Sequence, residues 1–214
     1  MELINPQKIS RSTEQSYRNR LAQLCNGLLV SNTFDCVDTI IYNSSAGHYH
    51  KHPAQGSNQL KTDRYLYYLH SGIAHTYITD PVSKKIKITK IWTKGDLIVN
   101  MNTLIKGSVA EESTHMLEDG ELVYISYESL RILSMQIPQM MNLFLHLQLE
   151  QQSSYHYYIS LLHLPGPKRL QAFLRKHPTL LQRINQDIIA NYLRMSRSRL
   201  SKALKLNKKI HHGN

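Results

Sequence analysis

Cysteine is scarce in this sequence of 214 residues, in which Cys25 and Cys36 are the only two thiols. Two thiols cannot build the disulfide framework of a small secreted domain, and they are too few to ligate an iron–sulfur cluster. The scarcity therefore favours a protein of a reducing cytoplasm, and neither a structural metal nor a cofactor is expected.

Long apolar runs are also missing. No stretch approaches the ~18 apolar residues that a membrane-spanning helix needs. The first residues, Met-Glu-Leu-Ile-Asn-Pro, are polar where an export signal would be basic and then apolar. A hydrophobic content of 41% is nevertheless enough to fill a globular core. We expect a cytoplasmic protein with no membrane partner.

Acidic residues are almost absent from the last quarter of the chain. Residues 1–163 contain 14 basic and 14 acidic side chains, whereas residues 164–214 contain 12 basic side chains and a single acid, Asp187. Twelve minus one accounts for the whole formal net charge of +11. Such a concentration of positive charge indicates a polyanionic partner, of which nucleic acid is the obvious one.

Residues from about 28 to 126 show the pattern of short β-strands. Segments 65–69 and 73–79 are rich in aromatic and β-branched residues, and a turn follows at Asp80. Several short strands joined by tight turns over ~100 residues predict an antiparallel barrel or sandwich. The polar stretch 42–64 is interpreted as a long loop between strands.

Helical patterns flank the strands. The first begins at Ser12, whose hydroxyl can cap a helix together with Gln15. The second is unbroken from Pro138 to His163 and would span ~39 Å as one helix. Its apolar residues form two seams, which are Met141, Leu145, Tyr155, Ile159 and Leu162, interrupted by Gln148 and Gln152, and next to it Phe144, Leu147, Tyr158 and Leu161. One seam can pack on the β-domain and the other on a partner chain; complete burial within its own domain is the alternative.

The basic tail has the pattern of three helices after a hinge at residues 165–167, where the charge balance changes. Asn185 and Ser196 are good N-cap residues, and only a short turn after Leu193 separates the two helices that they begin. That spacing is typical of a helix-turn-helix.

The last helix combines an apolar side with a cationic one. Leu200, Ala203 and Leu204 predict its inward side. An Arg on the outward side can pair with guanine in a major groove, and a Ser at the helix start suits a phosphate. The candidate DNA-binding residues are Ser196, Arg197, Ser198, Arg199, Ser201, Lys202 and Lys205. A charged face that is simply solvated is the alternative.

These motifs resemble the Crp/Fnr family of bacterial transcription regulators over roughly residues 20–206. Tyr-Tyr-Leu-His-Ser-Gly at 67–72 and Lys-Gly-Asp-Leu at 94–97 are similar to the family's "SG" turn and "GD" sequence. The tail from Arg169 to Lys202 is similar to the branch common in Bacteroidetes-type members.

The resemblance implies an α+β fold in three parts. Residues 1–137 would form a sensor with an antiparallel β-barrel of the double-stranded β-helix, or jelly-roll, type and flanking helices, like a cyclic-nucleotide-binding domain. Residues 138–164 would form a long dimerisation helix, and residues 165–214 a helix-turn-helix domain.

The resemblance also implies a function without catalysis, namely transcription regulation by a homodimer that reads an inverted repeat in double-stranded DNA. Further implied partners are RNA polymerase and a small-molecule effector of unknown identity. The family's base-reading positions correspond to Arg197, Ser198 and Lys202, and Ser196 corresponds to a phosphate-contacting position.

Two departures from the family pattern are visible. Arg194 stands in the turn where the family usually has Gly, so the turn either bears strain or is shifted. The family's phosphate-binding Arg is also missing, because no Arg occurs between Gly95 and Leu130. Carboxylates occupy that region and would repel a phosphate, so cyclic AMP is not expected to be the effector. The candidate effector-pocket residues are Gly95, Asn102, Gly107, Ser108, Glu111 and Glu112.

Three alternating histidines suggest a second function. His48, His50 and His52 would share one face of a strand, as in metal-binding barrels of the cupin type. Such sites also use a carboxylate a few residues later, and the next acid is Asp63. The lack of a carboxylate close to the histidines makes a cupin-like metalloenzyme with an incidental basic tail the alternative function and not the leading one. Binding of nucleic acid without sequence preference is a third possibility.

Overall fold

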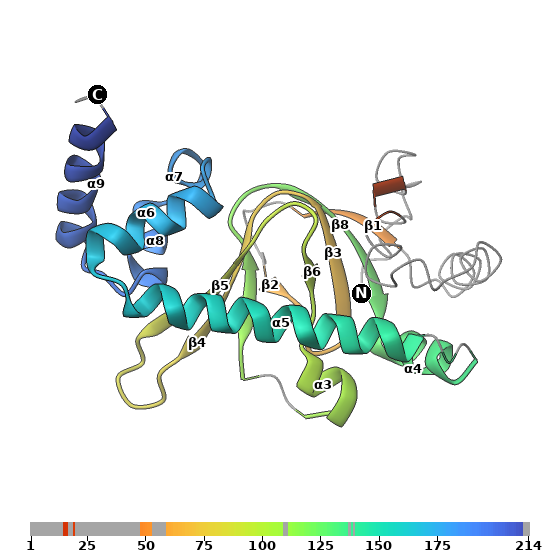
Figure 1. Cartoon of the computed structure of the whole chain (residues 1–214). Coiled ribbons are helices and arrows are strands. Elements are labelled where there is room, and N and C mark those ends of the chain that lie inside the picture. Colours follow the sequence, from red (N-terminus) through yellow and green to blue (C-terminus); the bar gives the residue numbers. More distant parts are fainter. Residues whose placement is uncertain are drawn as a thin grey trace. The chain divides into compact units, whose positions relative to one another are not determined.

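The computed structural model describes residues 15, 16, 19, 48–52, 59–108, 111–136, 138 and 140–211. Most of the helix expected from Ser12, and both cysteines, lie outside this part of the chain. The chain forms two compact units (Figure 1), of which the first comprises residues 1–76 and 91–150 and the second residues 77–90 and 151–214.

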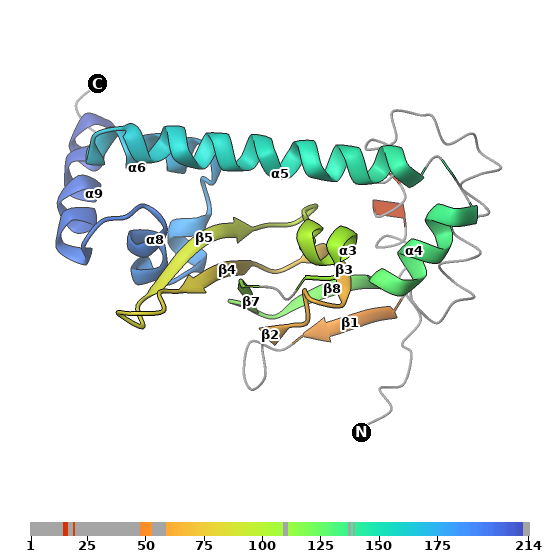
Figure 2. The same cartoon turned by 90° about the horizontal axis from the view of Figure 1, so that it is seen from below.

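The strands of the described part form two four-stranded sheets (Figure 2). One has the order β1-β8-β3-β6, with β1 at His48–His52, β8 at Gly120–Ser126, β3 at Tyr65–Ser71 and β6 at Leu97–Ile98. The other has the order β2-β7-β4-β5, with β2 at Gln59–Leu60, β7 at Ser113–Met116, β4 at Ala74–Thr79 and β5 at Ile86–Trp92. The pairs β1–β8, β3–β6, β3–β8 and β2–β7 are antiparallel.

The interpretation of residues 42–64 as a loop is wrong where β1 and β2 occur. Strand β1 is rich in polar residues and β2 has only two residues, so neither shows the apolar alternation that marks a half-buried strand. They are ordered through pairing with distant strands, since His50 lies opposite Leu122 and Leu60 opposite Thr114.

Strand β3 is buried on both faces, which explains its nearly continuous apolar sequence. Leu66 and Tyr68 belong to the cluster that packs against the helices of the first unit, and Leu69 belongs to the second cluster with Trp92. Within the second cluster region the Trp92 indole donates to the Thr76 hydroxyl at 2.7 Å, so its N–H remains hydrogen-bonded although buried.

The turn from β3 to β4 requires glycine at two contacting positions. Gly72 has a φ of 99°, and a Cβ built there would lie 2.9 Å from the Cα of Gly120. A Cβ on Gly120 would lie 2.3 Å from the Ser71 carbonyl oxygen. The "SG" turn can therefore approach the start of β8 only because neither glycine has a side chain.

Among residues 59–163, the described helices that accompany the sheets are α3 at Met101–Lys106, α4 at Tyr127–Gln136 and α5 at Met140–His163. Helix α5 begins two residues after the predicted start at Pro138 and ends at the predicted His163. Phe144, Leu147, Tyr158 and Leu161 are buried, whereas the side chains of the other seam remain exposed at Met141 (59%), Leu145 (58%) and Tyr155 (62%). The helix is thus not buried all round.

The tail contains four helices in its described part, one more than the sequence predicts. They are α6 at Gly166–Lys176, α7 at Leu180–Arg183, α8 at Gln186–Tyr192 and α9 at Arg197–His211. Helix α7 is a single turn, too short to produce an amphipathic period. Helices α6 and α8 both pack on α9, and Leu170, Phe173, Ile189 and Leu200 are fully buried in their core.

No helix in the described part is both long and apolar enough to cross a membrane. Among the same residues, no group of three or more His, Cys, Asp or Glu side chains could hold a metal ion.

Candidate nucleic-acid interface

Helix α9 begins directly after Ser196, and Ser196 caps it as predicted. The Ser196 hydroxyl accepts a hydrogen bond from Arg199 N at 3.3 Å, and its carbonyl accepts one from Leu200 N at 3.0 Å. The Ser198 hydroxyl lies 3.0 Å from the Ser196 hydroxyl. Two hydroxyls are therefore held together at the exposed start of the helix, where free N–H groups favour an anion.

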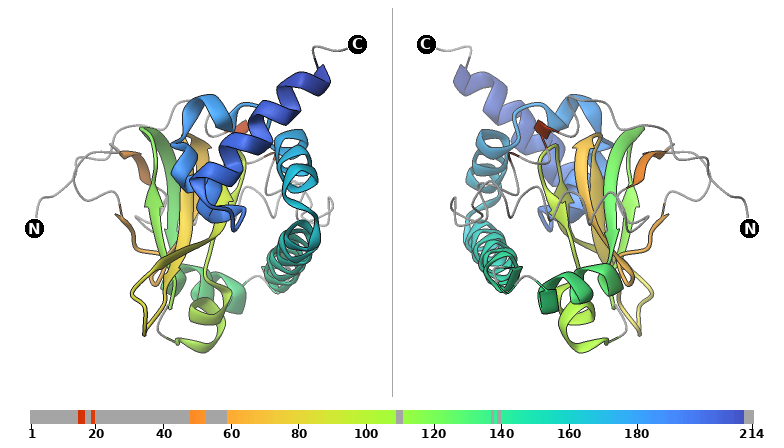
Figure 3. Two further views of the ribbon diagram at one scale, coloured as in Figure 1. Left: turned by 90° about the vertical axis from the view of Figure 1, so that its left-hand side faces the viewer. Right: turned by 90° about the vertical axis from the view of Figure 1, so that its right-hand side faces the viewer.

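The candidate DNA-binding residues lie on the exposed side of α9. On the inward side of α9, Leu200 and Ala203 are buried, with 0% and 4% of their surface exposed. Figure 3 (left) views α9 from its uncovered side. The exposed residues are Ser196, Arg197, Ser198, Arg199, Ser201, Lys202 and Lys205. The structure thus presents three hydroxyls and several cations together on one accessible surface of the second unit.

Helix α8 precedes α9 and is capped by Asn185, again as predicted. The Asn185 side chain accepts from Asp187 N at 2.8 Å. In the following turn Arg194 has a φ of 53°, and Met195 N donates to Ala190 O at 2.8 Å. The sequence left open whether this turn bears strain or is shifted. The turn is strained, because Arg194 itself adopts the left-handed conformation.

An ion pair that the sequence did not predict joins the starts of α8 and α9. Arg197 Nη1 donates to Asp187 Oδ1 at 2.8 Å and lies 3.4 Å from Asn185 Oδ1. Both charged side chains are solvent-exposed, at 51% for Arg197 and 67% for Asp187. The one available signal was that Asp187 is the only acid among the last 51 residues, 164–214.

A second arginine, Arg169, binds the backbone at the turn between α8 and α9. Arg169 on α6 donates to Leu193 O at 2.6 Å, and to Leu162 O at 2.7 Å and Leu164 O at 2.9 Å. It therefore joins the carbonyl at the end of α8 to those at the end of α5. This role of Arg169 is not predictable from the sequence, because a basic side chain in a basic tail gives no sign that it binds backbone carbonyls.

Aromatic rings fill the space beneath α8. Tyr158 and Tyr192 lie 4.9 Å apart between ring centroids, and Phe173 lies 5.7 Å from Tyr192 and 5.2 Å from His177. Burial raises the pKa of Tyr192, and burial, together with the charge of Lys176, lowers the pKa of His177 to about 4. The cluster is therefore neutral at physiological pH.

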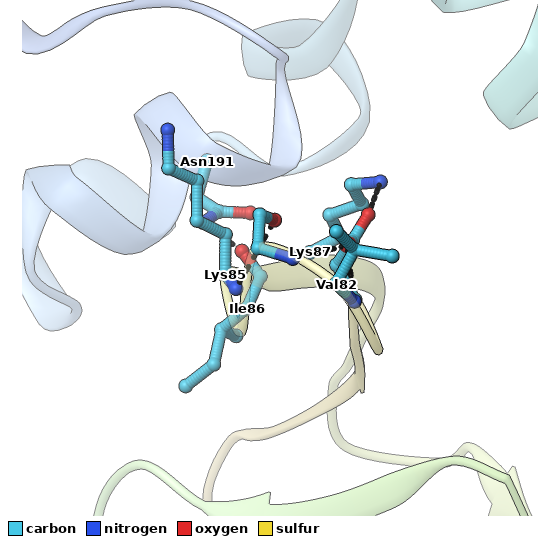
Figure 4. Close-up of polar contacts among 7 residues, drawn as sticks. Val82, Lys85, Ile86, Lys87 and Asn191 are labelled. Atoms are coloured by element: carbon cyan, nitrogen blue, oxygen red, sulfur yellow. Dashed lines mark hydrogen bonds and ion pairs between the residues drawn. The ribbon is translucent and has the colours of Figure 1, made fainter.

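Asn191 on α8 binds the outer edge of β5 within the second unit (Figure 4). Its amide nitrogen donates to Ile86 O, and its amide oxygen accepts from Ile88 N, both at 2.8 Å. The Tyr158 hydroxyl donates to Ile88 O at 3.4 Å. In the described part of the chain β5 is the last strand of its sheet, so these side chains bond backbone groups on the side away from β4.

The candidate effector region is built around α3. The Asn100 side chain caps the helix by accepting from Thr103 N at 3.0 Å, and Gly107 ends it with a φ of 68°. Arg131, the first arginine after Gly95, donates to Thr103 O and Leu104 O at 3.0 to 3.2 Å. The guanidinium of Arg131 is thus engaged by the carbonyls of α3.

The predicted pocket residues lie on separate segments of the first unit. Gly95 lies in the turn before β6 with a φ of 93°, and its N–H donates to Leu69 O at 2.8 Å. The others are exposed on α3, at its end or just before β7, namely Asn102, Gly107, Ser108, Glu111 and Glu112. No pocket enclosing the six is established, so the pocket stays a prediction.

The three histidines of the alternative function occupy β1. His48, His50 and His52 lie opposite Tyr124, Leu122 and Gly120 of β8. The alternation predicted for a strand is therefore present in the backbone, while the histidine side chains lie outside the described part of the structure.

Comparison by sequence gives no relative, since no protein-family model and no curated protein matches the chain. Comparison by structure does. FixK2 from Bradyrhizobium japonicum is 14% identical with a TM-score of 0.65, over 78% of this chain and 86% of that one. A protein described as a transcriptional regulator of the Crp/Fnr family, from Eubacterium rectale, is 17% identical with a TM-score of 0.64, over 86% of both chains.

A third similar structure is the global regulator CLP from Xanthomonas campestris, described as responsive to c-di-GMP. It is 19% identical with a TM-score of 0.59, over 82% of this chain and 93% of that one. At these identities the likeness establishes the fold. The chain has the α+β fold of Crp/Fnr-type regulators, which confirms the resemblance at that level and does not favour the metalloenzyme. The Bacteroidetes-type branch stays a prediction.

Proposed function

We propose that this protein is a transcription regulator that binds DNA in a sequence-specific manner and carries no enzymatic activity. The observation that carries the proposal is the exposed face of α9, in which Arg197, Ser198 and Lys202 project from a helix whose other side is buried. The short turn after α8 supports a helix-turn-helix, whose second helix enters a major groove by its N-terminal residues.

The proposed regulator acts as a homodimer. The exposed seam of α5 follows a heptad-like repeat from Met141 through Leu145 to Tyr155, the spacing at which two helices pair. Two copies of α9 related by a two-fold axis would read an inverted repeat with half-sites ~34 Å apart. The two-sheet module, proposed to be a sensor barrel, would bias the DNA-binding state if an effector binds it.

The proposed effector is not cyclic AMP. The family's phosphate-binding Arg is absent from the α3 region, and the nearest arginine, Arg131, already donates to the carbonyls of α3. Glu111 and Glu112 are exposed after α3, where a phosphate would meet negative charge. RNA polymerase is a further proposed partner, in keeping with a regulator of transcription.

Selection from random duplexes at a stated salt concentration tests the function. The purified protein is expected to recover a palindromic motif, with and without cyclic AMP. The Arg197→Ala variant should bind the recovered motif more weakly by ~1–3 kcal/mol, whereas an enzyme with an incidental tail would be indifferent. Asp63→Asn, an exposed change outside α9, is the control. Recovery of no motif would contradict sequence-specific DNA binding. A motif that appears only with cyclic AMP would contradict the proposal that cyclic AMP is not the effector.

A further inference from the structure

The acid in the basic tail contacts the arginine proposed to read a base. Asp187 is the only acidic residue among residues 164–214, and its Oδ1 lies 2.8 Å from Arg197 Nη1. The contact joins the start of α8 to the start of α9. The tail contains twelve basic residues and a single acid, so the pairing of that acid with Arg197 is not explained by the balance of charge alone.

Stability does not supply that explanation. Both side chains are more than half exposed, and ion pairs in water contribute little to folding because solvent and salt screen them. The same exposure means that Arg197 is not locked away from DNA. The ion pair instead favours one orientation of the Arg197 side chain, because Nη1 contacts Asp187 at the start of α8.

The ion pair leaves the rest of the guanidinium available. Within the described part of the chain, Nη1 is the only nitrogen of Arg197 with a hydrogen-bond partner, namely Asp187 and, more distantly, Asn185. The Nε–H and Nη2–H groups keep the fork geometry that pairs with O6 and N7 of guanine. An arginine held at one nitrogen has fewer orientations to lose when it makes that pair.

The Asp187 carboxylate also makes a phosphate a less favourable target for Arg197 than a guanine edge. In a helix-turn-helix the first helix crosses the DNA backbone while the second enters the groove. A phosphate bound to Arg197 would come close to the Asp187 carboxylate and be repelled, whereas a guanine edge carries no net charge.

We propose that Asp187 is a specificity-determining positioning residue, which directs Arg197 toward a base and away from the phosphate backbone. This inference rests on the proposed DNA-binding function. Asp187 is expected to lower affinity for DNA of random sequence and so to widen the gap between specific and non-specific binding.

The test compares Asp187→Asn with the wild-type protein on the selected duplex and on a scrambled duplex, across a range of salt concentrations. Freeing one cation for phosphate should tighten binding to scrambled DNA by about three- to tenfold and steepen the plot of log affinity against log salt by about one. Discrimination between the duplexes should fall by a similar factor. Asp187→Glu, which keeps the charge, should restore much of it.

Two controls make the result specific. Asp63→Asn adds the same charge at an exposed site outside the tail and should leave discrimination unchanged. In an Arg197→Ala background, Asp187→Asn should have no further effect on discrimination, because the residue acts through Arg197. Asp187→Ser, which suits the first turn of a helix, replaces Asp187→Asn if that variant unfolds.

The outcomes separate the two proposals. If the wild-type protein prefers no sequence, the proposed function and this inference both fail. If it does prefer a motif, and the charge-free variants match Asp63→Asn in discrimination and salt dependence, only the inference is overturned. Loss of discrimination that disappears in the Arg197→Ala background supports it.

Discussion

Arg194 occupies a left-handed backbone conformation in the turn between α8 and α9, with a φ of 53°. A side chain costs free energy in that region because its Cβ crowds the backbone, and glycine avoids the cost. The turn is held from both sides, since Met195 N bonds Ala190 O and Arg169 bonds Leu193 O. The surrounding contacts therefore impose the conformation on Arg194.

Replacement of Arg194 by Gly should stabilise the protein. We expect an increase in the free energy of unfolding of about 0.5–1 kcal/mol, because the strain at this residue is relieved. Urea denaturation followed by circular dichroism measures the effect. Arg194→Ala is the matched control, since it removes the charge and keeps the strain. Equal stability of the Gly and Ala variants would contradict the explanation.

Single residues of the tail differ in how well the sequence predicts their roles. Asn185 and Ser196 were predictable as N-caps because a cap acts on the residues next to it. The Asn191 amide was not, because it binds Ile86, 105 positions earlier in the chain. Only the folded structure brings that strand to α8.

Among the helices, α5 keeps the first part of an apolar seam exposed, from Met141 to Tyr155. Met141, Leu145 and Tyr155 are each more than half exposed, while Leu147 and Leu161 on the other seam are buried. An exposed apolar stripe on a long helix is costly in water and favours association with a second copy of the helix. The proposed dimer would cover it.

Substitution of Leu145 by Glu should shift the protein from dimer to monomer. A carboxylate placed in a helix pair loses its hydration without gaining a partner, so the dimer dissociation constant should rise by on the order of a hundredfold. Sedimentation velocity measures the change. Ser153→Glu introduces the same charge on α5 off the seam and should leave the association unchanged. A wild-type protein that is already monomeric would contradict the prediction.

The elements that the sequence predicted best are the ones with the most repeats of their period. Helix α5 was predicted to within two residues at its start because it repeats its pattern over many turns. Helix α7 and strand β2 span four and two residues and were missed. Elements this short owe their form to packing partners rather than to their own pattern.

Across the whole molecule, burial keeps several histidines neutral. Burial, with a smaller effect of His115, lowers the pKa of His75 to about 4, and burial does the same for His177 in the other unit. The ordinary pKa of histidine is 6.5. Between those values the unfolded chain binds protons that the folded chain does not, so protonation favours unfolding there.

The free energy of unfolding should therefore fall as the pH is lowered from about 6.5 toward 4. Above about pH 6.5 these histidines should not reduce it. Urea denaturation at a series of pH values measures it. His177→Gln should make the dependence shallower, and the exposed His163→Gln is the control. A free energy of unfolding that stays constant over this range would contradict the explanation.

The bond between Asn191 and β5 also bears on how the molecule avoids sticking to copies of itself. An uncovered strand edge offers N–H and C=O groups to which another chain can add as a further strand. Asn191 and Tyr158 occupy three such groups, on Ile86 and Ile88. Removal of α8 would free the two groups that Asn191 binds, Ile86 O and Ile88 N, so fragments that end before α8 should self-associate through β5.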